Sequence, residues 1–397
     1  MPKLLQINVT ANWGSTGKIA EEIGKLAINA GWESYIAYGR GRPVSKSRLI
    51  RVGNDYDMYS HILRTRLFDS HGLASRHATL SLIKKIKLIS PDIIHLHNIH
   101  GYYLNYPILF EYLKNTGIPV VWTLHDCWTF SGHCAHHLSP FCDKWKTECN
   151  NCVRLSSYPA SIWKDRSKRN FFQKKESFSS LPNLTLVPVS YWLQQELSSS
   201  FLADYHSFVI HNGIDLSIFT PSDNQISKQR DYYSILGVSS VWEARKGLDD
   251  FIKLRYLLPD NFHITLVGLS PKQIKSLPPG IKGITRTQSV EELRNLYREA
   301  DIFVNPTLED TYPTTNLEAM ACGTPVLTYA TGGSPESIGE ATGEVIDYGD
   351  VKKLAERIRK VCETHPYSSG RCRAHAEAHF DKNQAFQKYL ELYNKLI

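Results

Sequence analysis

The sequence predicts an α/β protein with two doubly wound parallel sheets, one in each half of the chain. The chain has 397 residues, which is too long for one typical hydrophobic core. Short β-branched or aromatic runs alternate with amphipathic stretches almost throughout, as they do in parallel sheets covered by helices. Hydrophobic residues make up 42% and charged residues 21%, which is typical of an ordinary globular protein.

The first half opens with a strand, a helix and a second strand, the pattern of a βαβ unit. Three further apolar runs are short enough to be buried strands, and amphipathic stretches separate the first of them. These elements define a first domain over residues 1–205. The expected strands are 4–9, 34–39, 92–98, 119–126 and 184–190, and the expected helices are 17–31, 78–89 and 104–116.

A second alternating series defines a donor domain over residues 206–375. Its helix at 289–300 begins with Ser289 and Glu292, spaced as in a capping box. After a break beyond Pro366, the segment 376–397 forms a terminal helix that could pack back on the first domain. The expected strands are 232–239, 262–269, 301–307 and 324–330.

The net charge and the N-terminal residues indicate which partners and which cellular compartment to expect. The net charge of +7 favours anionic ligands or lipid head groups, and nucleic acid is the weaker interpretation. The start "MPKLLQINVTANWG" lacks a charged leader followed by a long apolar core, and no apolar run approaches a membrane span. We therefore expect a cytoplasmic protein.

Ligands of doubly wound sheets gather at the carboxyl ends of strands, and the strand at 301–307 leads into a short helix. Pro313 suits the first helical position, while Gly323 and Pro325 end the helix. The amides at the helix start, with the helix dipole, suit a phosphate or diphosphate. These amides belong to Thr314, Thr315 and Asn316.

Two carboxylates flank this helix start. Glu318, one turn into the helix, can accept hydrogen bonds from the two hydroxyls of a ribose. Asp310, on the preceding loop, can accept from another hydroxylated group beyond the phosphates. Together they predict a site for a nucleoside diphosphate sugar. The alternative is that both are solvated acids without a ligand.

Asp310 and Glu318 have seven residues between them, and Glu318 begins the segment "EAMACGTPV", a pattern that resembles the donor-site signature of glycosyltransferase family 4. The family has glutamate at the first position, so the neighbouring Glu309 is an alternative to Asp310. The segment "VIHNGIDLSIFTP" at 209–221 resembles the family's passage into the second domain.

Sugar transfer leaves a nucleoside diphosphate whose negative charge needs a nearby cation. "VWEARKGLDDF" supplies Arg245 and Lys246. Family members carry an arginine five residues before this lysine, where the present chain has Val241. We assign Lys246 to the phosphate, with Arg245 either replacing the missing arginine or pointing to solvent.

In the first domain, Gly14 and Gly17 lie between a strand and a helix, where the backbone can approach a phosphate or sugar closely. Tight-turn geometry alone also explains them. His125 and Asp126 follow a strongly apolar strand, and the family has an active-site histidine in a similar segment. The resemblance implies that His125 positions the sugar and that Asp126 orients it or contacts the acceptor. His97 is a weaker candidate.

Five of the eight cysteines lie between residues 127 and 152, a clustering that indicates metal more often than disulfides when no export signal is present. The expected ion is a structural zinc held by four thiolates, which leaves no open position for catalysis. One of His133, His136 or His137 could replace a cysteine, and reduced thiols packed in a loop are the alternative. The predicted ligands are Cys134, Cys142, Cys149 and Cys152.

The resemblance implies a GT-B fold, with two Rossmann-like domains facing a central cleft. It also implies a retaining transfer from a UDP- or GDP-sugar to a glycan or lipid-linked acceptor, in bacterial surface polysaccharide synthesis and without a catalytic metal. The basic stretch 164–178, which contains three phenylalanines, either contacts an anionic membrane or is a solvated helix. The rival functions are a GT-B epimerase or phosphorylase and a non-enzymatic, zinc-stabilised binding module.

Overall fold

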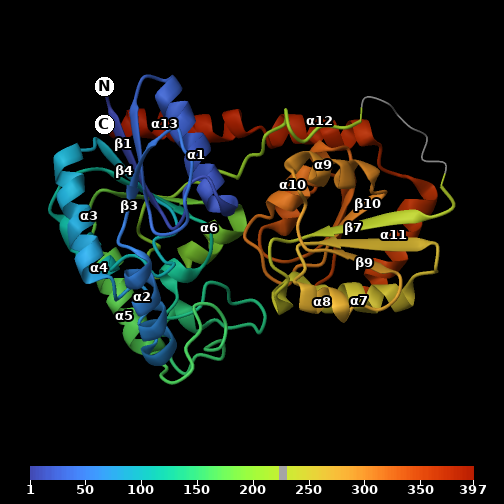
Figure 1. The fold of residues 1–397 in the computed structure, drawn as a ribbon, viewed down its shortest axis with the longest axis horizontal. Coiled ribbons are helices and arrows are strands. Elements are labelled where there is room, and N and C mark those ends of the chain that lie inside the picture. Colours follow the sequence, from blue (N-terminus) through green and yellow to red (C-terminus); the bar gives the residue numbers. More distant parts are fainter. Residues whose placement is uncertain (223–229) are drawn as a thin grey trace. The chain divides into compact units, whose positions relative to one another are not determined.

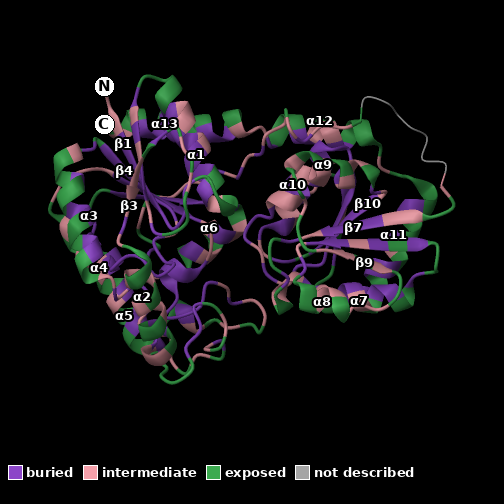
Figure 2. Cartoon of the chain, viewed as in Figure 1, coloured by how far each residue is buried: buried purple, intermediate pink, exposed green. Residues whose placement is uncertain are grey.

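The computed structural model describes residues 1–222 and 230–397 and divides into two compact units. The first unit comprises residues 1–211 and 385–397, and the second comprises 212–384. Each unit contains a six-stranded sheet flanked by helices (Figure 1). The central strands are mostly buried, whereas the outward faces of the helices are exposed (Figure 2), as in a parallel sheet that helices cover.

The first sheet is parallel and has the order β3-β2-β1-β4-β5-β6. The strand order reverses between β1 and β4, so their carboxyl ends form the topological switch point at which doubly wound sheets bind ligands. The strands are β1 (Lys3–Asn8), β2 (Glu33–Tyr38), β3 (Arg48–Arg51), β4 (Ile93–Leu96), β5 (Val120–Leu124) and β6 (Leu184–Pro188). The helices are α1 (Gly14–Asn29), α2 (Asp55–Phe68), α3 (Arg76–Ile89), α4 (Tyr106–Lys114), α5 (Ser167–Phe178) and α6 (Tyr191–Ser198), with short 3-10 turns at Trp128–Phe130 and Lys144–Lys146.

The second sheet is also parallel, in the order β12-β11-β10-β7-β8-β9. Its switch point lies between β7 and β10. The strands are β7 (Tyr233–Val238), β8 (Phe262–Val267), β9 (Ile281–Ile284), β10 (Ile302–Asn305), β11 (Val326–Tyr329) and β12 (Gly343–Ile346). The helices of this unit are α7 (Leu248–Leu257), α8 (Pro271–Lys275), α9 (Val290–Glu299), α10 (Thr314–Ala321), α11 (Val351–Thr364) and α12 (Ser369–His379), with 3-10 turns at Ala244–Lys246 and Ser334–Ser337. Helix α13 (Lys382–Leu396) follows and only begins in this unit.

From Ala385 onward, α13 belongs to the first unit. Its buried side chains share a core with strand residues such as Leu4 and Val121. Two of its tyrosines also bond to buried polar groups of the sheet: Tyr389 to Thr123 at 2.9 Å and Tyr393 to His95 at 2.6 Å. The C-terminal helix therefore covers part of the first sheet.

The sequence pattern did not anticipate three edge strands, β3, β9 and β12. Each has only four residues, with the sequences RLIR, IKGI and GEVI, so none contains a long apolar run. It also missed α2, whose apolar residues do not gather on one helical face. Within residues 1–222 and 230–397, no helix combines the length and apolar character needed to cross a bilayer.

Candidate functional site

Helix α10 begins at the carboxyl side of β10, as the proline and glycine signals indicate. Pro313 is the N-cap with extended backbone, one position earlier than predicted, and Thr314 is the first helical residue. The helix ends at Ala321, and Gly323 follows with φ of +83°, the left-handed conformation that glycine tolerates. The helix start and end are therefore set locally by these residues.

An ion pair between Lys246 and Asp310 lies just before this helix start. Lys246 Nζ donates to Asp310 Oδ2 at 2.5 Å, and the two side chains retain only 19% and 16% of their exposure. Lys246 lies in the segment after β7 and Asp310 in the loop after β10, so the pair sits at the second switch point. A cation and a carboxylate, far apart in sequence, are brought together where a ligand is expected.

Arg245 does not point freely into solvent. Its Nε donates to the carboxylate of Glu243 at 3.0 Å, and its Nη1 donates to the carbonyl of Glu309 at 3.1 Å. The Arg245 carbonyl in turn accepts from the amide of Leu308 at 2.7 Å. The Glu309 side chain is buried. Arg245 therefore links the two loops of the switch point.

The four predicted donor residues on α10 have different surroundings. Glu318 accepts a hydrogen bond from the hydroxyl of buried Tyr297 at 2.9 Å. The side chain of Asn316 is held in the interior by Asn305 at 2.8 Å and Ser337 at 3.0 Å, and its amide bonds to the carbonyl of Pro313 at 3.2 Å. Asn316 therefore fixes the helix start, while Thr314 and Thr315 are partly exposed there.

The sequence interpretation missed the loop after β11. Gly333 donates from its amide to the carbonyl of Asp310 at 3.1 Å, and Thr331 donates to the carbonyl of Thr307 at 2.8 Å. Gly332 has φ of +51°, and a Cβ there would come within 1.8 Å of the Asp310 carbonyl oxygen. This loop thus supports Asp310, and its two adjacent glycines after an apolar strand were the signal that could have found it.

In the first unit, the two predicted glycines have separate roles. A Cβ on Gly17 would approach Thr10 Oγ1 to 2.6 Å and its backbone to 3.3 Å, so Gly17 lets α1 pack against the preceding loop. Gly14 has φ of +68° with open space where its Cβ would be. Gly14 therefore provides only the turn, and leaves room beside the helix start.

His125 ends a chain of polar contacts that runs into the first sheet. Its Nε2 lies 3.2 Å from Nδ1 of His97, whose Nε2 lies 3.1 Å from Oε1 of Gln6. Gln6 donates from Nε2 to the carbonyl of Ala20 at 2.7 Å, so its Oε1 must accept from His97. Burial lowers the pKa of His97 well below its usual value, so the neutral ring carries its proton on Nε2 and accepts at Nδ1 from His125.

His125 is also held neutral. Burial lowers its pKa to about 4, in spite of the nearby charge of Asp126. With Nε2 donating to His97, the neutral ring keeps Nδ1 as its accepting nitrogen. His97 therefore lies behind His125 and fixes its tautomer.

Asp126 bonds to neighbours other than His125. It accepts from His100 Nε2 at 2.9 Å and from the amide of Trp128 at 2.9 Å. Burial acts to raise the pKa of Asp126, but His100 and these hydrogen bonds outweigh it and hold the pKa far below its usual value. His100 Nδ1 in turn lies 3.0 Å from the hydroxyl of Tyr158. Asp126 is thus an ionised carboxylate that positions the loop after β5.

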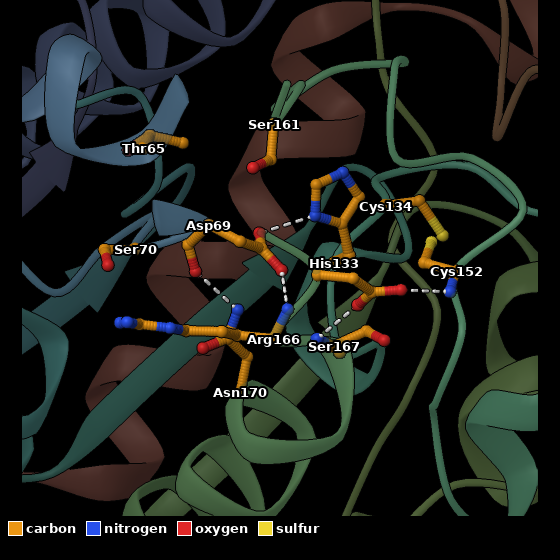
Figure 3. A network of polar contacts seen from close by, with 12 residues as sticks. Thr65, Asp69, Ser70, His133, Cys134, Cys152, Ser161, Arg166, Ser167 and Asn170 are labelled. Atoms are coloured by element: carbon orange, nitrogen blue, oxygen red, sulfur yellow. Dashed lines mark hydrogen bonds and ion pairs between the residues drawn. The ribbon is translucent and has the colours of Figure 1, made fainter. Parts of the chain in front are cut away.

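The predicted zinc ligands lie close enough to affect one another's pKa: Cys134 and Cys152 both interact with Cys149, and so does Cys142. Among the residues that the structure describes, no group of three or more His, Cys, Asp or Glu side chains could hold a metal ion. The sulfurs of Cys134 and Cys152 lie side by side (Figure 3), and their hydrogen bond raises the pKa of Cys134 and lowers that of Cys152. Cys149 Sγ instead accepts from the amide of Gly132 at 3.2 Å.

Carboxylates fasten the cysteine-rich segment to the helices around it (Figure 3). Asp69, at the end of α2, accepts from His133 at 2.6 Å and from the amide of Arg166 at 2.9 Å. Asp165 accepts from the amides of Cys152 at 2.6 Å and Ser167 at 2.8 Å. The segment after β5 is therefore joined to both α2 and the start of α5.

Comparison with known proteins matches both units to sugar-transferring families. The family model described as Glycosyltransferase Family 4 matches residues 17–218, and the model described as Glycosyl transferases group 1 matches residues 233–364. The putative colanic acid biosynthesis glycosyl transferase WcaC of Escherichia coli (strain K12) is 22% identical over 378 residues, which are 89% of each chain. D-inositol 3-phosphate glycosyltransferase of Mycolicibacterium smegmatis is 27% identical over 229 residues, 51% of each chain.

Solved structures share the fold over the whole length. Sucrose-phosphate synthase from Thermosynechococcus elongatus has a TM-score of 0.70 at 17% identity and covers 100% of this chain and 99% of its own. HepE from Anabaena in complex with UDP-glucose has a TM-score of 0.69 at 16% identity, with 99% of each chain covered. At these identities the likeness concerns the fold.

Proposed function

The chain belongs to glycosyltransferase family 4 and has the GT-B fold of two Rossmann-like domains, and from this premise we propose that its donor is a nucleoside diphosphate sugar. The observation that carries the proposal is the Lys246–Asp310 ion pair beside the start of α10. A diphosphate replaces Asp310 as the partner of Lys246, and the released carboxylate becomes available to sugar hydroxyls.

Each predicted donor residue of the second unit then has a defined role. The amides of Thr314 and Thr315 at the start of α10 bind the diphosphate, which the helix dipole favours. Glu318 accepts from the ribose hydroxyls, and its bond from Tyr297 at 2.9 Å orients the carboxylate. Arg245 holds the loop of Glu309 in place through its 3.1 Å bond.

We propose transfer with retention of the anomeric configuration. The bond between the anomeric carbon and the diphosphate oxygen breaks, and a bond to the acceptor oxygen forms on the same face of the sugar. The acceptor hydroxyl proton passes to the departing diphosphate oxygen, so no protein nucleophile is required. Lys246 stabilises the negative charge that grows on this oxygen, and His125 positions the sugar through its accepting Nδ1.

The proposed acceptor is a glycan or a lipid-linked sugar in the synthesis of a bacterial surface polysaccharide. The name of WcaC, a colanic acid biosynthesis enzyme of similar length, supports this assignment. A UDP-sugar is the first donor to test, because HepE was solved with UDP-glucose. The structural zinc stays a prediction for Cys134, Cys142, Cys149 and Cys152, to be tested by metal analysis of the purified protein, and it has no step in this mechanism.

Calorimetric titration of the protein with UDP, GDP and ADP, followed by their sugars, tests the proposed function. One nucleoside diphosphate should bind more tightly than the others, and its sugar should be consumed only when an acceptor is present. Consumption of donor without an acceptor would instead indicate an epimerase, and binding of none of them would reject the donor site. The anomeric configuration of the product, read by NMR, tests retention.

A further inference from the structure

Two arginines of the first unit bring positive charge to one buried tyrosine. Tyr102 lies in the loop after β4 and is only 7% exposed. Burial raises the pKa of its hydroxyl, and the charges of Arg66 and Arg40 act against this rise. Arg66 belongs to α2 and Arg40 to the loop after β2. Two separate elements therefore place a guanidinium group near the same hydroxyl.

The neighbouring loops fix the backbone at Arg40. The amides of Gly39 and Arg40 both donate to the carbonyl of Val9 at 3.1 Å. A Cβ on Gly39 would overlap the ring of Tyr103, so the loop after β2 packs directly against the loop after β4. Arg40 itself is exposed. Its side chain therefore extends from a well-fixed backbone at the carboxyl edge of the first sheet.

In the part of the chain that the structure describes, neither arginine pairs with a carboxylate. The loops after β1, β2 and β4, at residues 9–13, 39–47 and 97–105, contain three lysines or arginines and no carboxylate. The ion pairs of the first unit that involve lysine or arginine join Lys25 to Glu22, Arg48 to Glu33, Arg51 to Asp55 and Lys168 to Glu148. Arg40 and Arg66 therefore repel each other without a compensating anion.

The rings around Tyr102 also lack a hydrogen-bond acceptor. The centre of the Tyr102 ring lies 4.8 Å from that of His71 and 6.0 Å from that of Tyr158. His71 Nε2 accepts from the amide of Gly101 at 3.3 Å, and burial lowers the pKa of this ring well below its usual value, so its proton is on Nδ1. Among the described residues this buried nitrogen has no partner. A polar group that enters the cluster can supply the acceptor.

Tyr158 connects these rings to the first switch point. Its hydroxyl lies 3.0 Å from His100 Nδ1, and His100 Nε2 donates to Asp126 at 2.9 Å. Tyr158 as a whole is 41% exposed. Asp126 directly follows His125, which the proposed mechanism places at the sugar. The cluster therefore lies at the edge of the first sheet where an acceptor has to bind.

The basic stretch at 164–178, by contrast, uses its central lysine inside the core. Lys174 is buried and donates to the carbonyls of Trp128 and Ser131 at 2.5 and 2.9 Å. Phe171 and Phe178 are buried as well. The apolar side of α5 therefore belongs to the core, and its buried lysine holds the loop after β5.

We propose that the acceptor carries a phosphate group, which Arg40 and Arg66 bind beside Tyr102. Guanidinium groups bind phosphate oxygens through paired hydrogen bonds, and an anion between the two arginines removes their repulsion. The protonated Tyr102 hydroxyl can donate to the same group. The phosphate belongs to a sugar phosphate or to the diphosphate of a lipid-linked sugar. The inference rests on the proposed function, to which it adds the chemical class of the acceptor.

The test is calorimetric titration of the full chain with pyrophosphate and with glucose 1-phosphate, after the preferred nucleoside diphosphate has filled the donor site. One further binding event should appear. Arg40→Ala and Arg66→Ala should each weaken it by at least about tenfold, because a charged hydrogen bond to phosphate is lost. Arg48→Ala is the matched control: Arg48 is an exposed arginine on β3 that pairs with Glu33, and its replacement should leave this affinity unchanged.

The two probes distinguish the sources of the phosphate. Tighter binding of pyrophosphate indicates a diphosphate-linked acceptor, and tighter binding of glucose 1-phosphate indicates a sugar phosphate. Absence of the further binding event with both probes, or equal affinity in the wild type and Arg40→Ala, overturns the subsite.

The affinity for the nucleoside diphosphate separates this inference from the proposed function. It should be the same in Arg40→Ala as in the wild type, which also shows that the variant is folded. A weaker affinity in Arg40→Ala would assign Arg40 to the donor and overturn the acceptor subsite. If the wild type binds no nucleoside diphosphate, the proposed function fails, whereas pyrophosphate binding that Arg40→Ala weakens and Lys246→Ala does not would still support a phosphate site in the first unit.

Discussion

The two units use the same strand order but build their switch points from different groups. In the first unit, the ends of β4 and β5 carry buried histidines whose hydrogen bonds reach from His125 through His97 to Gln6. In the second, the site consists of backbone turns, a helix start and the Lys246–Asp310 pair. We therefore expect pH to change the stability of the first unit, and we expect the second switch point to bind anions.

The largest expected effect is acid unfolding of the first unit. Burial lowers the pKa of five histidines there, and backbone amides donate to Nε2 of His61 at 3.0 Å and of His71 at 3.3 Å. Protonation would break these bonds. In the described part of the second unit, burial lowers the pKa of one histidine, His375. The five are His61, His71, His95, His97 and His125.

The direction of this pH effect follows from the linkage between proton binding and folding. A pKa that is lower in the folded state means that the unfolded chain binds more protons, so stability falls as pH decreases. The pKa of His125 falls from 6.5 to about 4, which is worth about 3 kcal/mol at roughly 1.4 kcal/mol per unit. The contribution of these histidines to the free energy of unfolding should be fully present above pH 6.5 and should decrease towards pH 4.

Urea titrations at several pH values measure this effect. All tryptophans except Trp242 lie in the first unit, so tryptophan fluorescence follows that unit. The urea midpoint should fall steeply between pH 6.5 and 4. A urea midpoint that stays constant over this range would contradict the proposal that buried histidines make the first unit sensitive to pH.

The second largest effect should come from Lys246→Ala. Removal of the cation nearest the proposed leaving group should lower kcat by about 10²- to 10³-fold, the usual loss when one charge-stabilising donor is removed. The matched control is Lys253→Ala, because Lys253 also pairs with an aspartate, Asp250, at 2.8 Å but is 62% exposed. Steady-state kinetics should show near wild-type kcat for the control; equal losses in both variants would indicate a general effect on the unit.

Glu318→Ala should mainly weaken donor binding. Two hydrogen bonds from ribose hydroxyls to a carboxylate are worth about 1.5–3 kcal/mol each, so the calorimetric Kd should rise by at least about 10²-fold. Tyr297→Phe removes the 2.9 Å bond to Glu318 but keeps the carboxylate, and should raise Kd less. A Kd that is unchanged in Glu318→Ala would remove the ribose assignment.

The sequence predicted local backbone structure better than contacts between distant segments. Pro313 and Gly323 set the limits of α10 to within one residue, because both act through their own backbone. Ser289 does accept from the amide of Glu292 at 3.2 Å, but the Glu292 side chain bonds to Gln288 instead of closing the capping box. The adjacent glycines after β11 marked a tight loop, but its partner did not follow from them: Gly333 donates to the Asp310 carbonyl at 3.1 Å because packing brings the two loops together.

The family resemblance sharpened the site in the second unit more than in the first. Asp310 and Lys246 were named from motifs, and the structure places them 2.5 Å apart. The sequence did not indicate that Gln6 accepts from His97. A single glutamine within an apolar strand does not reveal its hydrogen-bond partner. Similarly, no sequence signal showed that Asp69 and Asp165 anchor the cysteine-rich segment, and the zinc site at its cysteines stays a prediction.

The smallest expected effect tests the tautomer of His125. Gln6→Glu keeps an acceptor for His97 Nε2 but adds a charge that raises the pKa of His97. A protonated His97 then donates from Nδ1, so His125 must accept at Nε2 and carry its proton on Nδ1. We expect kcat to fall by about tenfold, or 1.4 kcal/mol, with nucleotide Kd unchanged. Gln6→Leu, which also loses the 2.7 Å bond to Ala20 but adds no charge, is the control. The ¹⁵N shifts of the His125 ring should show its proton on Nδ1 in Gln6→Glu only; the same pattern in Gln6→Glu and wild type would mean that Gln6 does not set the tautomer.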